Sequence, residues 1–460
     1  MKSPAIRKSL PLSPPRDGER GVTILLVAVA LVAIIAMAAL SIDAVTLYLA
    51  SANAQQAADS AALAGARMLS LSGMTGDPQN ESGRWSAACT SAQQVASAVG
   101  SQITVGGTVP ASVTVTFPND PSGNCNDAAG TSTVFGVNPQ VQVKVQSVQL
   151  PTFFARIWGK TGSSVSATAT AEVFNPSGSG NFTTSGNIIP VRPRCVKPWI
   201  IPNQDPGNGG ANFVNPNDGS IRNPGIRLSG AGAGVIGELF TLIPDCKPSG
   251  PCAVPGNLIP DNPPRANGSN LDFVPAPPPP SSTAVPSACG NTSAFQQAIA
   301  GCDQTTVYQC GVEDQNTVDL GVNNVPSETA DASQCLINHV SSPTDEDSLD
   351  TTNFPYQVKA GTNSPLTRAG VASNTVITSS NSIVTVPIYD SDPPVPLNPT
   401  GTTSVTIVGF LQVFINNVNS ANGNLNVTVL NVSGCGNGTN TVGTAVAGSS
   451  PVPVRLISNP

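Results

Sequence analysis

An uninterrupted apolar stretch near the N-terminus constrains this chain more than any other feature. Residues 22–42 read VTILLVAVALVAIIAMAALSI, carry no charge, and include only Thr23 and Ser41 as polar residues. A helix rises about 1.5 Å per residue, so this stretch would be roughly 30 Å long, which is the thickness of the hydrocarbon core of a bilayer. The sequence therefore predicts one transmembrane helix over residues 21–43.

The charges on either side of this stretch predict its orientation. Asp17 and Glu19 lie before it, but so do five basic residues: Lys2, Arg7, Lys8, Arg16 and Arg20. The first basic residue after it is Arg67. Because basic flanks stay in the cytoplasm, we expect residues 1–20 to form a cytoplasmic tail, and the chain from about residue 43 to lie outside the cytoplasm.

A cleaved signal peptide is the alternative interpretation of the same stretch. Ala36-Met37-Ala38 and Ala52-Asn53-Ala54 both resemble cleavage sites. The apolar stretch is longer than is usual for a signal peptide, and the helical pattern continues past both sites. The mass of the mature protein distinguishes the two alternatives.

An alanine-rich segment, residues 44–72, continues the helical pattern. It contains no proline and no glycine before Gly65, and alanine is the strongest helix former. Apolar residues, mostly alanine, recur at alternating spacings of three and four, which is the pattern of a helix-packing seam: Leu47, Ala50, Ala54, Ala57, Ala61, Ala64 and Met68. Such a face lets another backbone come close. The partner could be a second protein, another copy of this chain, or the chain's own domain. We expect the helix to end near Gly73.

Composition limits what the rest of the chain can be. Only 10% of the residues are charged and 4% are aromatic, while glycine and proline number 43 each, so we expect β-rich structure with long loops. The net charge is −7 and no basic cluster is visible, which argues against a nucleic-acid partner.

Residues 73–175 read as an α+β domain. Residues 84–99 have the spacing of a short amphipathic helix. Residues 113–117, 141–145 and 165–173 then alternate apolar and polar, which is typical of antiparallel strands with one wet face. Residues 151–159 (PTFFARIWG) read as a short helical step that packs its aromatic side chains on this sheet.

The remaining chain divides into two segments. Residues 176–380 are rich in proline, glycine, asparagine and cysteine and are expected to be mainly loops, with a polyproline spacer at 276–282 and one helix over 291–302 capped by Asn291 or Ser293. Residues 381–460 return to strands at 382–389, 404–416 and 424–432, and Asn422-Gly423 predicts a two-residue hairpin turn. The fold class is therefore α+β, with mostly antiparallel β domains after the long helix.

The chain has ten cysteines: Cys89, Cys125, Cys195, Cys246, Cys252, Cys289, Cys302, Cys310, Cys335 and Cys435. None lies in a C-x-x-C motif and the chain has one histidine, His339, which argues against a zinc site. An even number of cysteines in a chain that lies outside the cytoplasm indicates disulfide bonds. A mixture of bridges and free buried thiols is the alternative, and the connectivity cannot be read from spacing.

The N-terminal region resembles TadE/TadG-like Flp pilus assembly proteins of the tight-adherence branch of type IV pilus systems. The residues that carry this resemblance are Gly21 with the apolar span, Ser41-Ile42-Asp43, and AQQAADSAALAGA at residues 54–66. Asp43 would match the family's acidic residue where the helix leaves the bilayer, and Asp59 the one within the alanine-rich string. Cleaved pilins carry a glutamate at the position that Leu26 occupies here, so the resemblance is to the uncleaved, TadG-like members.

This resemblance implies a structural or assembly role in a Flp-type pilus or related secretion machine. The partners would be pilus or secretion-system proteins, and the location the bacterial cytoplasmic (inner) membrane, with the bulk of the chain in the periplasm or outside the cell. Some members carry a von Willebrand A domain, but the nearest string to its metal motif, residues 331–335, lacks the last serine. An anchored surface protein or adhesin, which binds through its cysteine-rich segment, is the alternative.

We expect no enzyme, no cofactor, no metal and no small-molecule substrate. Cys335 and His339 have helical spacing, but a cysteine outside the cytoplasm is expected to be bridged. The acidic residues at 345–350 lack the glycine and distal glutamate of a calcium loop and are expected to form a solvated turn. The glycine-rich residues 230–237 follow no clear strand, so they predict a turn rather than a phosphate-binding loop.

Overall fold

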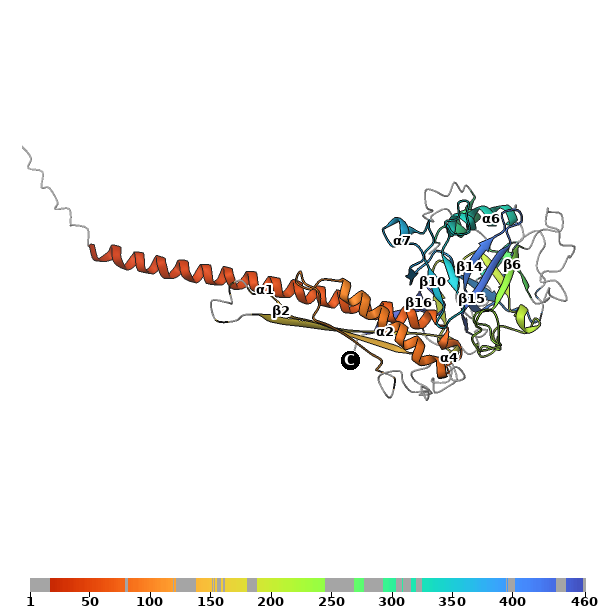
Figure 1. Ribbon diagram of the computed structural model, residues 1–460, viewed down its shortest axis with the longest axis horizontal. Coiled ribbons are helices and arrows are strands. Elements are labelled where there is room, and N and C mark those ends of the chain that lie inside the picture. Colours follow the sequence, from red (N-terminus) through yellow and green to blue (C-terminus); the bar gives the residue numbers. More distant parts are fainter. Residues whose placement is uncertain are drawn as a thin grey trace, which may run out of the picture.

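The structure is a computed structural model of the 460-residue chain. It describes residues 17–78, 82–118, 120, 138–150, 152, 154, 159, 162–179, 188–244, 269–276, 293–302, 308, 316–319, 325–393, 395, 402–435 and 444–457. The described parts form a long helix, a stem packed around the second half of that helix, and a β-rich head (Figure 1).

The long helix, α1, runs without a break from Asp17 to Leu71. Its 55 residues correspond to a length of about 80 Å. The predicted transmembrane and alanine-rich segments are therefore one helix, as the absence of proline indicated. It ends before Gly73, whose φ of 72° lies in the left-handed region that glycine adopts most readily.

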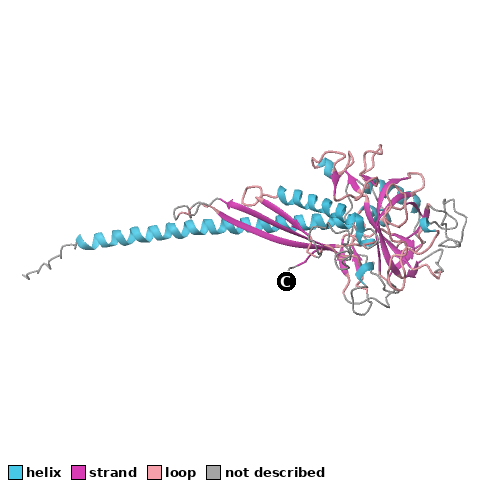
Figure 2. Cartoon of the chain, turned by 60° about the horizontal axis from the view of Figure 1, so that its bottom comes forward, coloured by secondary structure: helices cyan, strands magenta, loops and turns pink. Residues whose placement is uncertain are grey.

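The stem consists of the second half of α1 packed with helix α2 (Trp85–Gln102) on one antiparallel sheet (Figure 2). The strand order is β1-β2-β3-β17. The strands are β1 (Ser112–Thr116), β2 (Gln140–Leu150), β3 (Ser163–Val173) and β17 (Val454–Ile457). The alternating valines of β2, Val141, Val143 and Val145, are buried under the helices, while Lys144 is exposed, as the sequence pattern predicted.

The fourth strand of this sheet comes from the end of the chain. β17 pairs with β3 so that Val454 lies opposite Val173, and the Nε of Arg455 donates to Glu172 at 2.6 Å. The C-terminal segment 381–460 thus supplies strands to the head and also one strand to the stem. The residues paired in β17 and β3 are almost three hundred positions apart in the sequence.

The head is built around a closed barrel with the strand order β12-β14-β15-β6-β7-β5. The strands are β5 (Trp199–Pro202), β6 (Leu239–Pro244), β7 (Asn270–Pro275), β12 (Ile383–Tyr389), β14 (Ile407–Val418) and β15 (Leu425–Gly434). Three of them come from segment 176–380, where the composition predicted mainly loops. These strands are four to six residues long and include proline and asparagine, so no local period reveals them.

Smaller elements surround the barrel. Short sheets are formed by β9 with β10 and β11, by β8 with β13, and by β4 with β16. The bounds of these strands are β4 (Val191–Pro193), β8 (Asn316–Asp319), β9 (Ser348–Asp350), β10 (Gln357–Lys359), β11 (Val376–Ile377), β13 (Thr402–Val405) and β16 (Val446–Gly448). The helices are α4 (Pro176–Ser179), α5 (Ala294–Ala300), α6 (Val325–Leu336) and α7 (Pro365–Arg368), with 3-10 turns at Met74–Gly76, Ser82–Arg84 and Pro206–Asn208.

Two local predictions have clear outcomes. Ser293 caps α5 through a capping box with Gln296, as expected for one of the two candidate caps. β14 and β15 form the predicted hairpin, but Val418 pairs with Leu425, so the turn spans residues 419–424 and is longer than the two residues that the Asn-Gly pair predicted. Residues 151–159 and 276–282 lie mostly outside the described residues, so the helical step and the polyproline spacer stay predictions.

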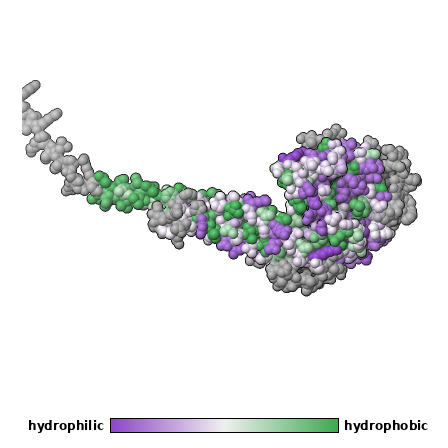
Figure 3. Space-filling view, viewed as in Figure 1, coloured by the Kyte–Doolittle hydropathy of each residue, from purple (hydrophilic) through white to green (hydrophobic). Residues whose placement is uncertain are grey.

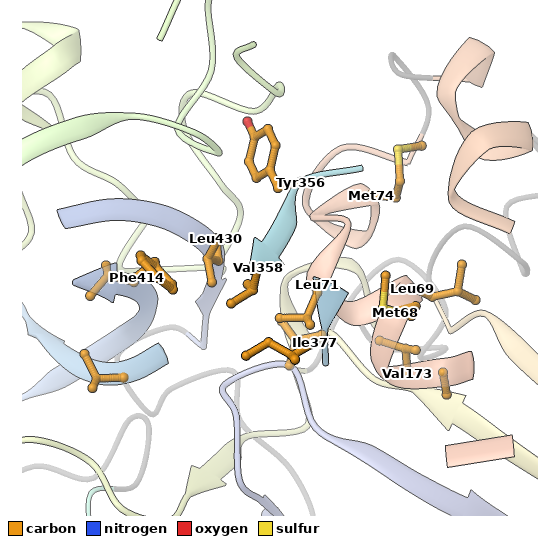
Figure 4. Packing of buried hydrophobic residues seen from close by; sticks show 14 of the residues in the cluster. Met68, Leu69, Leu71, Met74, Val173, Tyr356, Val358, Ile377, Phe414 and Leu430 are labelled. Atoms are coloured by element: carbon orange, nitrogen blue, oxygen red, sulfur yellow. The ribbon is translucent and has the colours of Figure 1, made fainter. Parts of the chain in front are cut away.

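One hydrophobic core continues from the stem into the head. It includes Ala57 in the stem and Phe414 in the barrel, and at the junction Leu71 and Met74 lie near Val358, Ile377 and Leu430 (Figure 4). Buried hydrogen bonds cross the same junction: Asn431 Nδ2 donates to Ser70 O at 2.9 Å, and Ser70 Oγ donates to Val452 O at 3.1 Å. The head is therefore attached to the stem through packing as well as through the chain.

Candidate functional site

The first half of α1 projects from the stem as an exposed apolar rod. Its large side chains are about half exposed or more along the whole length, with Ile24 70% exposed and Met37 65% exposed, while Ala39 is buried. Figure 3 shows the rod as a continuous apolar surface. Within the described part of the chain, α1 is the one helix that is long and apolar enough to cross a membrane. An exposed apolar surface of this extent is typical of a segment that contacts a membrane or another protein.

Asp43 marks the point where α1 enters the stem. The residue is 4% exposed, and its Oδ2 accepts a hydrogen bond from the backbone N–H of Phe154 at 3.1 Å. Thr46 Oγ1 donates to the carbonyl oxygen of Asp43 at 2.9 Å. The carboxylate therefore fixes the loop after β2 to the helix, directly beyond the apolar rod. The resemblance placed an acidic residue at this boundary.

Just beyond Asp43, one side of α1 is still apolar and exposed. Val45, Tyr48 and Leu49 are 57%, 75% and 55% exposed. The opposite side carries Leu47 and Ala50, which pack on the stem. Tyrosine is enriched where a helix passes from hydrocarbon to headgroups, because its ring is apolar and its hydroxyl is polar.

The seam predicted on α1 lies inside the stem. Ala50, Ala54, Ala57, Ala61 and Met68 are buried, and Leu47 and Ala64 are half-buried. The covering elements are α2 and strands β2 and β3. A Cβ added at Gly65 would lie 3.0 Å from Val141 Cγ1 and 3.1 Å from Ala96 Cβ, which shows how closely the backbones approach.

The structure therefore fills this seam with the chain's own elements, which was one of the partners that the pattern left open. A second protein or a second copy could reach these alanines only by displacing α2 or the sheet. Asp59, the other acidic residue of the resemblance, lies half-buried on the flank of the helix and accepts a hydrogen bond from Gln55 Nε2 at 2.7 Å.

The described cysteines are all oxidised. Cys195 is bonded to Cys302, which ties the segment between β4 and β5 to the end of α5. Cys89, Cys335 and Cys435 are also disulfide-bonded. The alternative of free buried thiols therefore fails for these five residues. The other five, Cys125, Cys246, Cys252, Cys289 and Cys310, lie outside the described residues.

The side chains that could have formed a catalytic or metal site are engaged elsewhere. His339 Nδ1 lies 2.9 Å from Glu346 Oε2, and Cys335 is bridged, so these two residues do not form a nucleophile–base pair. Asp345 accepts backbone N–H bonds from Ser341 and Ser342, which lower its pKa. No group of three metal-binding side chains occurs in the described ranges.

Sequence reasoning missed two buried ionisable groups in the head. Lys197 is 4% exposed, and its Nζ donates to the carbonyl oxygens of Ile299 and Gly301 at 2.6 and 2.8 Å; burial lowers its pKa to about 7. Glu238 is 2% exposed, and its pKa is raised to about 8 by burial and by the neighbouring carboxyl of Asp205. No spacing in the sequence signals either group, because their partners come from distant loops.

Comparison with known proteins agrees with the N-terminal geometry. Residues 21–68 match the family model described as putative Flp pilus-assembly TadE/G-like. No curated protein and no solved structure matches the chain. The matched residues begin at the start of the apolar rod and end where α1 meets the head. They therefore cover both the apolar rod and the part of α1 that lies in the stem. The chain thus carries a TadE/G-like Flp pilus-assembly segment, and this segment is the helix that would reach a membrane.

Proposed function

We propose that this protein is a membrane-anchored structural component of a Flp-type pilus or a related secretion machine. The observation that carries the proposal is the coincidence of the TadE/G-like match at residues 21–68 with the exposed apolar rod of α1. Residues 22–42 would span the cytoplasmic membrane, the basic N-terminal tail would stay in the cytoplasm, and the stem and head would lie in the periplasm or outside the cell.

The structure suits a spacer that holds a head away from the membrane. From Asp43 to Leu71 the helix advances about 42 Å. The buried alanine seam and the shared core make the stem and the head one packed body. A disulfide such as Cys195–Cys302 also suits a compartment outside the cytoplasm. The protein would act through helix packing and protein contacts, without catalysis.

Fractionation and protease protection test the anchoring. The full chain, with an epitope tag at its C-terminus, should stay in the membrane after alkaline carbonate extraction and should lose the tag when protease is added to spheroplasts. Its mass should include the N-terminal tail. A soluble tagged product that lacks the first forty or so residues would show cleavage instead and would contradict the anchor.

A gene deletion tests the role in pilus assembly. The deletion strain should lose surface pili by electron microscopy, and the full chain should restore them. The matched control replaces residues 22–42 with an unrelated transmembrane helix, which should restore pili if the span serves only as an anchor. Wild-type numbers of pili in the deletion strain would contradict an assembly role.

An anchored adhesin is the second candidate, and it is favoured by the size of the disulfide-linked head at the far end of the stem. The deletion strain separates the two: an adhesin mutant would keep its pili and lose attachment to surfaces. An assembly mutant would lose both. Genes for a pilus ATPase and a prepilin peptidase beside this one would favour assembly.

A further inference from the structure

Two adjoining cavities lie where the stem meets the head. One, of about 270 Å³, is lined by the end of α1, by the start of β12 and by residues 449–454. The other, of about 330 Å³, is lined by residues 194–197, by the end of α5 and by the same start of β12. Ser380, Ile383 and Ser449 line both cavities, so we describe them together as the junction groove.

Every charged side chain that lines the junction groove in the described structure is basic. Arg67 lines the first cavity, and Arg194 and Lys197 line the second. None of the three forms an ion pair with a described carboxylate, whereas Arg227, Lys359 and Arg455 elsewhere do. The chain as a whole has more acidic residues (27) than basic ones (20). A groove whose charged residues are all basic therefore differs in charge from the rest of the protein.

The remaining lining residues are a mixture of uncharged polar and apolar side chains. The polar ones offer hydroxyl and amide hydrogen-bonding groups: Ser70, Ser380, Asn381, Thr385, Gln412, Ser449 and Ser450. Leu63, Leu71, Ile383 and Val452 supply apolar contacts. This combination matches a peptide, which presents backbone amides, some apolar side chains and carboxylates together.

The walls of the groove are fixed by covalent and buried contacts. The disulfide partners Cys195 and Cys302 both line the second cavity. Lys197 is held by two carbonyl oxygens at the end of α5, and Ser70 is held by Val452. A groove whose walls are ordered before binding loses little conformational entropy when a ligand enters.

Lipid headgroups cannot be the anionic partner of these basic side chains if the protein is anchored as proposed. Arg67 lies 24 residues beyond Asp43 on one straight helix, which places it roughly 36 Å from the membrane boundary. Charges are screened over about 8 Å at physiological salt. An anionic partner would therefore have to reach the stem–head junction from the compartment that holds the head, and not from the membrane surface.

We propose that the junction groove binds an acidic, extended peptide segment of a second protein, with Arg67 and Arg194 pairing with its carboxylates. This inference rests on the proposed extracytoplasmic position of the head. It assigns the groove, rather than the alanine seam, as the surface through which the protein meets a partner. Arg67 and Arg194 are exposed and can be substituted without disturbing the core.

The test uses the full chain in detergent and a fluorescein-labelled peptide of repeating Glu-Ser-Val units. A Gln-Ser-Val peptide of the same length is the uncharged control. Anisotropy titration should show saturable binding of the Glu peptide that weakens as NaCl rises from about 50 mM to about 500 mM. The double variant Arg67→Glu/Arg194→Glu should bind at least about tenfold more weakly. Arg222→Glu, at an exposed arginine outside the groove, should bind within about twofold of wild type.

Three outcomes would overturn the proposal: equal binding of the two peptides, no binding of the Glu peptide, or equal losses in the groove variant and the Arg222→Glu control. Displacement of the peptide by inorganic phosphate at low millimolar concentration would reassign the groove to small anions. Thermal melts of each variant show whether it is folded. Since the titration does not depend on pili, failure here leaves the deletion experiment and the proposed function intact.

Discussion

At the scale of single residues, the head buries an acidic pair beside one arginine. Glu238 Oε1 accepts the backbone N–H of Gly207 at 2.6 Å, and its Oε2 lies 3.4 Å from Nη2 of Arg227. Asp205 is fully buried and accepts from Asn223 Nδ2 at 3.3 Å. Burial, and next the neighbouring carboxyl of Asp205, favour the protonated form of Glu238 and so raise its pKa. This arrangement makes the stability of the head depend on pH.

The substitution Glu238→Gln should remove that dependence. The pKa of Glu238 is raised to about 8 from its ordinary value of 4.5, so the folded protein keeps a proton that the unfolded chain has lost. The stabilisation is complete below pH 4.5 and is lost as the pH rises through 8. Relative to Glu238→Gln, the wild type should lose on the order of 1 kcal/mol per pH unit between pH 5 and pH 8.

Chemical denaturation at several pH values measures this difference. Comparing wild type with variant at each pH cancels the other titrating groups, including Lys197, whose lowered pKa makes stability rise with pH between about 7 and 10.5. A difference that stays constant from pH 5 to pH 8 would contradict the raised pKa of Glu238.

At the scale of elements, the alanine seam determines how closely α1 packs. Ala61 is fully buried, and a Cβ added at Gly100 would lie 3.4 Å from its methyl group. Such contacts leave no room for larger side chains, so the seam holds the stem together through close backbone approach.

Replacing Ala61 with leucine should therefore destabilise the stem by about 1–3 kcal/mol, because the extra atoms push α2 away. Ala52→Leu is the matched control: Ala52 is exposed on the same helix, and its substitution should change stability by less than about 0.5 kcal/mol. Hydrogen exchange of the α2 amides measures both. Equal protection of α2 in the two variants would show that the seam is not packed as described.

The elements that the sequence predicted are those whose signals are local. The end of α1 at Gly73, the helix at 85–102 and the alternating strands β2 and β3 follow from propensity and period alone. Three barrel strands, β12, β14 and β15, were also predicted from their period. The closure of the barrel was not, because β5, β6 and β7 are short and meet only through pairings between distant segments. The junction groove was missed for the same reason: its basic residues lie on α1 and on the segment after β4, and no spacing relates them.

At the scale of the whole molecule, the C-terminal strand closes the stem. β17 covers the edge of β3 at Val173, and Val452, just before it, is fully buried beside α1. Deleting residues 452–460 should expose that edge and lower the melting temperature of the stem by several degrees, since it removes four strand residues and a buried side chain. Deleting only residues 458–460 is the control, because it leaves β17 intact. Scanning calorimetry checks both, and equal melting temperatures would contradict the closure.

The anchor should be separable from the fold, because nearly all packing begins beyond it. The described hydrophobic core starts at Ala50, and in residues 22–42 only Ala39 is buried. A chain of residues 41–460 keeps Asp43 and its bond to Phe154 while it loses the apolar rod. We expect it to leave the membrane fraction and to melt within about 2 °C of the full chain in the same detergent, since Ala39 is the one buried side chain of residues 22–42 that it loses. A fragment that aggregates or melts far lower would mean that the rod stabilises the stem and is not solely a membrane segment.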